Sequence, residues 1–326
     1  MFKSDDRQYE PKLVTAVDLA EKLHECARKT EERIYKYLEC KDDDIKTVYD
    51  AMKYSISAGG KRIRPYLVCE FSRILGGDED VALDFAAAIE MLHTYSLIHD
   101  DLPCMDNDDY RRGKPTNHKV FGVDVATLAG DGLLTMSFFA LSSANTSPSV
   151  IKEAVKTLSF NAGAEGMIGG QIIDMMAEGK KSDSTGISDA HFDGNGENPP
   201  IDYDTLIKLQ NKKTGALMRA AVSLGCIAAG ADKEILDISL EYADNVGLCF
   251  QIVDDVLDKK GDFSALGKNI GSDRENGKTT FLSFMNEDKA MKYASELTDR
   301  AVGAAMKLEN SQNLISLARV LLTRNK

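Results

Sequence analysis

The stretch His99–Arg112, HDDLPCMDNDDYRR, decides how this chain of 326 residues is interpreted. Five of its fourteen residues are aspartates, and two arginines end it. An apolar segment of helical length precedes it, and Pro103 ends that helix because proline disfavours helical geometry in the residue before it. Aspartates are unfavourable at a helix carboxyl end, which already carries partial negative charge. The stretch therefore predicts a cation site at the end of a helix, and carboxylates without His or Cys favour a hard ion such as Mg²⁺.

A second aspartate set strengthens this interpretation. The segment Phe250–Asp258 reads FQIVDDVLD, and on a helix Asp254 and Asp258 share a face that Asp255 flanks. Three like charges on one face repel each other unless a metal ion or a basic ligand neutralises them. A single aspartate pair is usually a solvated acidic loop. Two such sets predict a metal site instead.

Composition excludes several classes of partner. The chain is 43% hydrophobic, lacks tryptophan and carries a formal net charge of -12. This charge argues against nucleic acid or an anionic membrane, which bind basic surfaces. Six cysteines lack CxxC spacing, which indicates reduced thiols and a cytoplasmic location. The first residues lack the apolar core of a secretory signal, and no uninterrupted apolar run reaches the roughly 18 residues of a membrane span.

The hydrophobic pattern predicts an all-α protein. Apolar residues recur at helical spacing along most of the chain, and alternating β-branched runs are absent from the sequence. A polar segment at about 179–200 predicts a loop insertion within one domain spanning 1–326, because helices of one style flank it. The expected architecture is a helical bundle with a site between facing helices. Helices are expected at 12–40, 45–56, 66–75, 81–102, 120–144, 149–178, 202–229, 234–259, 287–308 and 313–324.

Basic residues supply the complementary charge. In Gly59–Arg64, GGKRIR, two glycines let the backbone approach a ligand that three cations surround, which is typical of a phosphate site. The alternative is a helix start with exposed basic residues. His93, on an apolar helix, is by default a core histidine. With Arg111-Arg112 and two isolated lysines, the pattern predicts a pocket for two polyanions, one held through metal ions. No Walker or GxGxxG loop indicates a nucleotide.

From about Leu38 to Lys326 the chain resembles the trans-isoprenyl diphosphate synthases. Six blocks occur in that family's order, which makes a chance resemblance negligible. The resemblance implies an all-helical isoprenoid synthase bundle with a central cavity, and a homodimer. The blocks are GGKRIRP at 59–65, SLIHDDLPCMDNDDYRRGKPTNHKVFG at 96–122, GGQIID at 169–174, KKTGAL at 212–217, FQIVDDVLD at 250–258 and LGKNIGSD at 266–273.

The resemblance also assigns roles to residues. Two aspartate motifs would hold three Mg²⁺ ions on the diphosphate of an allylic substrate; their members are Asp100, Asp101, Asp106, Asp254, Asp255 and Asp258. The same diphosphate would contact Arg111, Lys213 and Lys268. Isopentenyl diphosphate would bind at Gly60, Lys61, Arg64, His93 and Arg112. Thr214 and Gln251 lie where they could stabilise a carbocation.

The implied reaction is the head-to-tail (1′-4) condensation of isopentenyl diphosphate with dimethylallyl or geranyl diphosphate. Mg²⁺ and cations stabilise the charge that develops on the leaving diphosphate, and the released diphosphate takes up the proton. Tyr95, five residues before Asp100, resembles the bulky floor of the product tunnel in bacterial farnesyl synthases and favours a C15 product. Ser96 beside it leaves some room, and a C20 product typical of plant-type geranylgeranyl synthases is the alternative.

The sequence gives less support to two other classes of protein. A non-catalytic modulator subunit of a prenyl synthase tends to lose one aspartate motif, whereas both are present in this chain. A terpene cyclase typically carries an Asn/Ser/Glu second metal motif, whereas this chain has DDVLD. The interpretation is therefore an active prenyltransferase.

Overall fold

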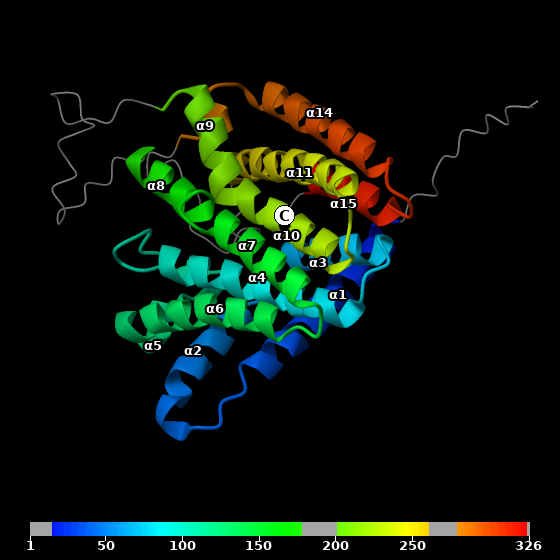
Figure 1. Ribbon diagram of the computed structural model, residues 1–326. Helices are drawn as coiled ribbons and strands as arrows, with labels where there is room; N and C mark the ends of the chain where they lie inside the picture. Colours follow the sequence, from blue (N-terminus) through cyan, green and yellow to red (C-terminus); the bar gives the residue numbers. More distant parts are fainter. Residues whose placement is uncertain (1–14, 178–200, 261–278, 325–326) are drawn as a thin grey trace, which may run out of the picture.

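The computed structural model describes residues 15–177, 201–260 and 279–324, which form helices packed into one bundle (Figure 1). The predicted all-α fold is confirmed. The predicted insertion at 179–200 and Lys268 lie outside the described residues. The helices are α1 (Ala16–Tyr37), α2 (Lys46–Ile56), α3 (Ile63–Ile74), α4 (Glu79–Asp100), α5 (Asn117–Phe121), α6 (Val123–Ser143), α7 (Pro148–Ala162), α8 (Met167–Ala177), α9 (Tyr203–Gln210), α10 (Ala216–Ala228), α11 (Lys233–Lys260), α14 (Glu287–Ala305) and α15 (Gln312–Thr323).

Helix α4 lies in the core of the bundle and carries the first aspartate motif at its end. It begins where the Asp78 carboxylate accepts a hydrogen bond from the Val81 N–H at 3.0 Å, as a helix N-cap does. Helices α3, α6 and α10 pack around it. By length and composition α4 could cross a membrane, but 83% of its apolar window is buried inside the protein. Its hydrophobicity is therefore that of a core helix.

Helix α6 is also long and apolar enough to cross a membrane, but the rest of the protein buries less of it than of α4. Only 39% of its apolar window is buried. It packs against α4 and α2 and runs straight through Gly130 and Gly132. Gly130 is used for close packing: a Cβ there would stand 2.1 Å from the His99 imidazole of α4.

Two further differences from the predicted helices lie next to the site. The predicted helix 149–178 is two helices, α7 and α8, with a break around Gly163. The predicted helix 202–229 contains a π-helical turn, η2 (Asn211–Gly215), between α9 and α10. Single π turns within α-helices are frequent at functional sites, because they change the direction of the side chains that follow. This turn carries the KKTG segment singled out from the sequence.

A short hairpin that the sequence did not predict follows the first aspartate motif. Strands β1 (Tyr110–Arg111) and β2 (Lys114–Pro115) pair antiparallel, with Arg111 opposite Lys114. Arg112 and Gly113 form the two-residue loop, with φ of 54° and 76°. Two positive φ values in such a loop match the right-handed twist of the strands. The hairpin turns Arg111 and Arg112 back toward the bundle.

The core has two parts, and α11 contributes to both. The larger part surrounds α3, α4, α6 and α10, and includes the fully buried side chains of Phe71, Phe85 and Tyr242. The smaller part lies between α11 and α14 and includes Phe281 of the 3-10 turn η3 (Phe281–Ser283). Fixed on both sides, α11 holds the second aspartate motif rigidly beside η2.

Candidate functional site

The first aspartate motif is a folded turn at the end of α4. Asp100 is the last helical residue, and the Asp106 N–H donates to the Asp100 carbonyl at 2.8 Å, which folds the chain back on itself. Asp101 is 3% exposed, and its carboxylate accepts from Arg111 Nε at 2.6 and 2.8 Å. The buried carboxylate is thus paired, as burial of a charge requires. The hairpin and the aspartate turn hold each other in place.

Asp100 carries its charge in an unfavourable environment. Burial raises the pKa of this carboxyl, and the carboxylate of Asp106 raises it further, while Lys213 lowers it. The Gln171 side-chain amide of α8 donates to Asp100 Oδ1 at 2.7 Å. A buried carboxyl close to a second carboxylate gains stabilisation from a bound cation.

The π turn brings Lys213 and Thr214 between the two aspartate motifs. Lys213 Nζ donates to Asp174 Oδ2 of α8 at 2.5 Å. Helix α8 approaches this turn closely because residue 170 is glycine: a Cβ there would lie 2.3 Å from the Lys213 backbone nitrogen. The lysine therefore lies at the contact between two helices, within electrostatic reach of Asp100.

The second aspartate motif presents its members in different environments. Gln251 links Thr214 to Asp255, since its Oε1 accepts from Thr214 Oγ1 at 3.2 Å and its Nε2 donates to Asp255 Oδ1 at 3.0 Å. Asp255 is 5% exposed and also accepts from the Phe281 N–H at 2.9 Å. Asp254 instead accepts from Arg324 Nη2 at 2.8 Å, and Asp258 is half-buried one turn later.

The GGKRIR segment and the hairpin form a cationic cluster. Gly60 has a φ of 128°, which L side chains rarely adopt, and a Cβ there would lie 2.6 Å from the Arg112 guanidinium carbon. Arg112 Nη1 donates to the Gly59 carbonyl. The glycine thus makes room for an arginine that comes from a distant part of the chain.

Burial disfavours the positive charges of this cluster. Burial lowers the pKa of Lys61, Arg64 and Arg324, and lowers that of Arg112 to about 10. The buried Nε of Arg64 and the Nε and Nη1 of Arg324 have no hydrogen-bond partner. A buried donor without a partner is costly, so the cluster fits an anion with several oxygen acceptors.

His93 belongs to this cluster and is not a plain core residue. Its Nε2 lies 3.4 Å from Arg64 Nη1. Burial and then the positive charge of Arg64 lower the pKa of His93 well below its ordinary value. The imidazole is therefore neutral at neutral pH and adds no charge to the cations of the cluster.

Arg62 of the same segment is paired with carboxylates of neighbouring helices and does not belong to the cationic cluster. It is 3% exposed, and its guanidinium donates to Glu90 of α4 at 2.5 Å and to Glu31 of α1 at 2.9 Å. It also has a positive φ of 47° at the start of α3. Paired on both sides, Arg62 fixes the backbone of the segment so that Lys61 and Arg64 point to the cluster.

The structure adds three residues that were not predicted as site residues. Gln171 and Asp174 lie within the GGQIID block, and Arg324 lies near the end of the chain. Arg324 donates to the Phe250 carbonyl at 2.6 Å, and its guanidinium lies 3.7 Å from the centre of the Phe250 ring. The GGQIID spacing could have indicated the first two, whereas Arg324 has no local signal that distinguishes it from a surface arginine.

Tyr95 and Ser96 lie on α4 just before the aspartates. Tyr95 is 5% exposed, its ring packs edge-on to the His99 ring at 5.6 Å, and burial raises its pKa to about 12. Ser96 is half-buried and donates to the His93 carbonyl at 2.9 Å. The bulky tyrosine thus lies five residues before Asp100, whose charge adds to the shift of its pKa.

The aspartates suit Mg²⁺ that a substrate helps to bind. Among the described residues, no three His, Cys, Asp or Glu side chains converge into a complete metal site. Mg²⁺ is usually held by one or two carboxylates together with substrate phosphates and water, and not by an all-protein cage. Oxygen-only donors at the carboxyl end of α4 and on α11 fit this mode of binding.

The structure thus places two aspartate motifs beside a cluster of cations in which buried guanidinium nitrogens lack hydrogen-bond partners. Comparison with known proteins gives the family: residues 45–316 match the polyprenyl synthetase family model, and the chain belongs to that family. It is 42% identical over 281 residues to the geranylgeranyl diphosphate synthase of Cyanophora paradoxa, which covers 85% of this chain and 88% of the relative. It is also 42% identical over 267 residues to the farnesyl diphosphate synthase of Geobacillus stearothermophilus, covering 81% and 83%.

A solved structure agrees with this assignment. The geranyltransferase of Helicobacter pylori, complexed with magnesium and isoprenyl diphosphate, superposes with a TM-score of 0.75 at 29% identity, covering 96% of this chain and 98% of that one. The chain is therefore a trans-prenyltransferase that elongates prenyl chains.

Proposed function

We propose that this protein condenses isopentenyl diphosphate with dimethylallyl or geranyl diphosphate to give farnesyl diphosphate, within one domain spanning 1–326. The observation behind the two-substrate proposal is that two sites suited to a diphosphate lie side by side and differ in their chemistry. One consists of carboxylates that need a cation, and the other of buried guanidinium groups that need an anion. Both substrates carry a diphosphate, and the two sites would hold them by different chemistry.

The cationic cluster would bind isopentenyl diphosphate directly. Arg64, Arg112 and Lys61 supply charged donors, Gly60 allows the close approach, and His93 stays neutral. Arg324 joins this set because its guanidinium has buried donors without partners. Charge-assisted hydrogen bonds to phosphate are stronger than neutral ones.

The allylic diphosphate would lie between the two aspartate motifs. When bound, Mg²⁺ ions, expected to be three, neutralise the charge that develops on the leaving diphosphate. The carboxylates of Asp100, Asp101 and Asp106 from one side, and Asp254, Asp255 and Asp258 from the other, would hold them.

The chain's own cations assist at the same diphosphate. Lys213 would donate from the π turn, and Arg111 retains donors beyond those used on Asp101, because a guanidinium has five N–H groups. Lys268 is assigned to the same diphosphate by the family resemblance. The Gln251 carbonyl oxygen, oriented by Thr214 and Asp255, would face the carbocation. The released diphosphate takes up the proton, so no side-chain base is needed.

Product length is the finer part of the proposal. Tyr95, buried five residues before Asp100, would block the product tunnel that the family resemblance implies and so supports a C15 product. Geranylgeranyl synthases among the relatives support C20 as the second candidate, at the same 42% identity as the farnesyl synthase.

One assay tests both the condensation reaction and the length of its product. Purified protein with Mg²⁺, isopentenyl diphosphate and geranyl diphosphate should give a C15 product, and Tyr95→Ala should shift most of it to C20 or longer, because the truncated side chain opens the tunnel. Chromatography of the dephosphorylated alcohols measures this. Tyr95→Phe is the matched control, since it keeps the bulk and should keep the C15 product. A C20 product from the unaltered protein would keep the chemistry and reject the role of Tyr95.

The modulator subunit is a candidate of another class. Both aspartate motifs are present in this chain, which favours an active enzyme. If no product forms with either allylic starter while the protein is folded, the modulator becomes the better proposal.

We also propose a homodimer that pairs through α6 and α7. Large apolar side chains are exposed there: Leu128 is 59% exposed, Phe139 54% and Phe160 62%. Leu128 and Phe139 are eleven residues apart, which places them on one face of α6. Exposed apolar surface of this kind is typical of a protein interface. Sedimentation equilibrium should give twice the chain mass of 35.7 kDa, and a single-chain mass at micromolar concentration would contradict the proposal.

The proposed location is the cytoplasm. All six cysteines are free thiols in the structure, as expected in a reducing compartment. Several relatives are named as chloroplastic, among them the enzyme of Capsicum annuum, so a plastid is the alternative.

A further inference from the structure

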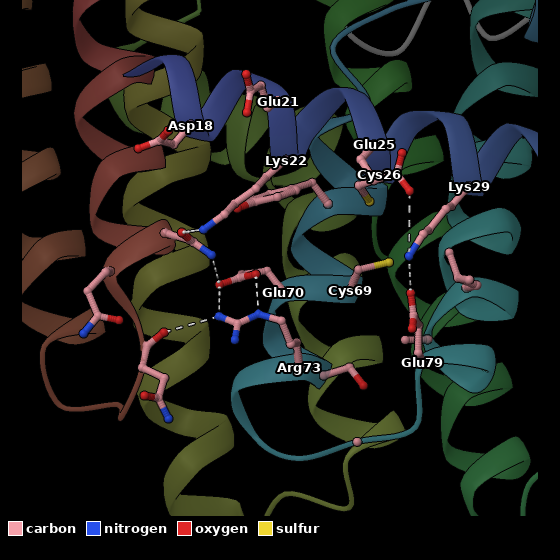
Figure 2. A pocket seen from close by; sticks show the side chains of 18 residues that line it. Asp18, Glu21, Lys22, Glu25, Cys26, Lys29, Cys69, Glu70, Arg73 and Glu79 are labelled. Carbon is pink, nitrogen blue, oxygen red and sulfur yellow. Dashed lines mark hydrogen bonds and ion pairs between the residues drawn. The ribbon is translucent and has the colours of Figure 1, made fainter. Parts of the chain in front are cut away.

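A cavity lies far from the aspartate motifs. Its volume is about 1020 Å³, and it lies between α1, α3 and the first turn of α4, next to the start of α15 (Figure 2). Glu79 at one end of α4 lines it, whereas Asp100 ends the same helix. At 1.5 Å per residue the two ends are about 30 Å apart. This cavity is therefore separate from the proposed catalytic site.

Two cysteines from different helices meet in this cavity. Cys26 of α1 and Cys69 of α3 both line it, and both are only partly buried, so small molecules can reach them. Figure 2 shows both sulfur atoms in the space between the two helices. The Thr30 hydroxyl lies 4.0 Å from the Cys26 sulfur, and the two thiols are close enough to affect each other's pKa.

This contact divides the two thiols into an attacking and a resolving group. Hydrogen bonding from Cys69 lowers the pKa of Cys26, with the Thr30 hydroxyl adding to the effect. The pKa of Cys69 is raised, first by the same hydrogen bond and then by burial. A thiol that ionises more easily attacks a disulfide first, and a neighbouring thiol completes the exchange.

We propose that Cys26 and Cys69 form a reversible disulfide between α1 and α3 by exchange with a small disulfide such as oxidised glutathione. The Cys26 thiolate attacks one sulfur of the small disulfide, which forms a mixed disulfide and releases one thiol. Cys69 loses its proton and attacks the Cys26 sulfur, which releases the second thiol. The two protein thiols thus lose two electrons and two protons, and the small disulfide gains them as two thiols.

The other four cysteines have no comparable arrangement. Burial raises the pKa of Cys226 to about 11 and raises that of Cys249. Cys104 is exposed in the aspartate turn. Cys40 donates a hydrogen bond to the backbone carbonyl of Asp42. These positions predict slow reaction for the buried pair and simple mixed disulfides for the exposed ones.

Cys26 and Cys69 lie on the two helices that hold the GGKRIR segment. Glu31, five residues after Cys26 on α1, accepts from Arg62 at 2.9 Å, and Arg64 lies five residues before Cys69 on α3. A bond between the cysteines would therefore fix the two helices that hold the cationic GGKRIR segment. The experiment below measures no activity, so its result does not depend on the proposed function.

The test is peptide mapping of the full chain. The reduced protein is treated with excess oxidised glutathione, free thiols are alkylated, and the protein is digested with trypsin without reduction. Cys26 lies in the tryptic peptide 23–28 and Cys69 in 63–73, because Pro65 blocks cleavage after Arg64. We expect these two peptides to be joined, with a mass lower by two hydrogen atoms than their sum. Both peptides alkylated, or each carrying glutathione, would overturn the proposal.

Variants and stability give independent checks. Cys69→Ser should leave glutathione on Cys26 and give no linked peptides. Cys26→Ser should also give no linked peptides. Cys226→Ser is the control and should still give the linked pair. Oxidation of the unaltered protein should raise its Tm by about 5 °C, since the bond closes a loop of roughly 40 residues. An unchanged or lower Tm for the linked form would contradict a preformed pair.

Discussion

Replacing Asp254 by Asn should lower kcat/KM about 10³-fold, the size of effect expected when one group that stabilises developing charge is lost. The amide keeps the shape of the carboxylate but loses its charge, and a neutral oxygen is a weaker partner for Mg²⁺ beside a diphosphate. Its oxygen can still accept from Arg324, which lies 2.8 Å from Asp254 Oδ1. The fold should therefore persist while turnover fails. Steady-state kinetics at saturating Mg²⁺ measures the loss, and circular dichroism checks the helices.

The same helix offers a matched control. Asp244 of α11 pairs with Arg219 at 2.5 Å on the surface, where the pair is about half exposed. Exposed pairs contribute about 0.2 to 1 kcal/mol. Asp244→Asn should therefore change kcat/KM by less than about twofold. Equal losses in both variants would mean that charge on α11 matters only for folding, and would reject the metal-holding role of Asp254.

The helices of this protein could be predicted because their signals are local. An apolar segment of helical length and a proline after the aspartate pair place α4 to within two residues at each end. The two aspartate motifs were found for a similar reason, since three carboxylates within a few residues are unusual in an apolar helix. Those predictions needed no knowledge of which segments meet in space.

Features that depend on distant segments could not be predicted. Asp255 is held by the Phe281 backbone N–H, and Asp254 by Arg324, which lies 70 residues away along the chain. Lys213 meets Asp174 only because Gly170 lets α8 approach the π turn. Periodicity carries no information on such contacts. The hairpin at 110–115 was missed because two-residue strands are too short to show alternation.

The glycine pair at the start of the cationic segment allows a sharp test of the second anion site. Gly60→Ala should raise KM for isopentenyl diphosphate about 10- to 150-fold, because displacing Arg112 removes charge-assisted hydrogen bonds of about 1.5 to 3 kcal/mol. The new methyl group would lie 2.6 Å from the guanidinium carbon of Arg112. The allylic substrate lies at the other site, so its KM should change little. Initial rates with each substrate varied in turn separate the two constants.

Gly59→Ala is the control that separates lost contact from backbone strain. Gly59 also has a positive φ, 80°, but a Cβ there meets nothing within 4 Å. An alanine at either position pays for an unfavourable φ, roughly 1 to 3 kcal/mol of stability. Only the alanine at 60 also moves Arg112, so KM for isopentenyl diphosphate should rise in that variant alone. If both variants raised it equally, strain in the segment would explain the effect and Arg112 would have no direct part in binding. A rise confined to Gly60→Ala would instead assign the diphosphate to the guanidinium that this glycine accommodates.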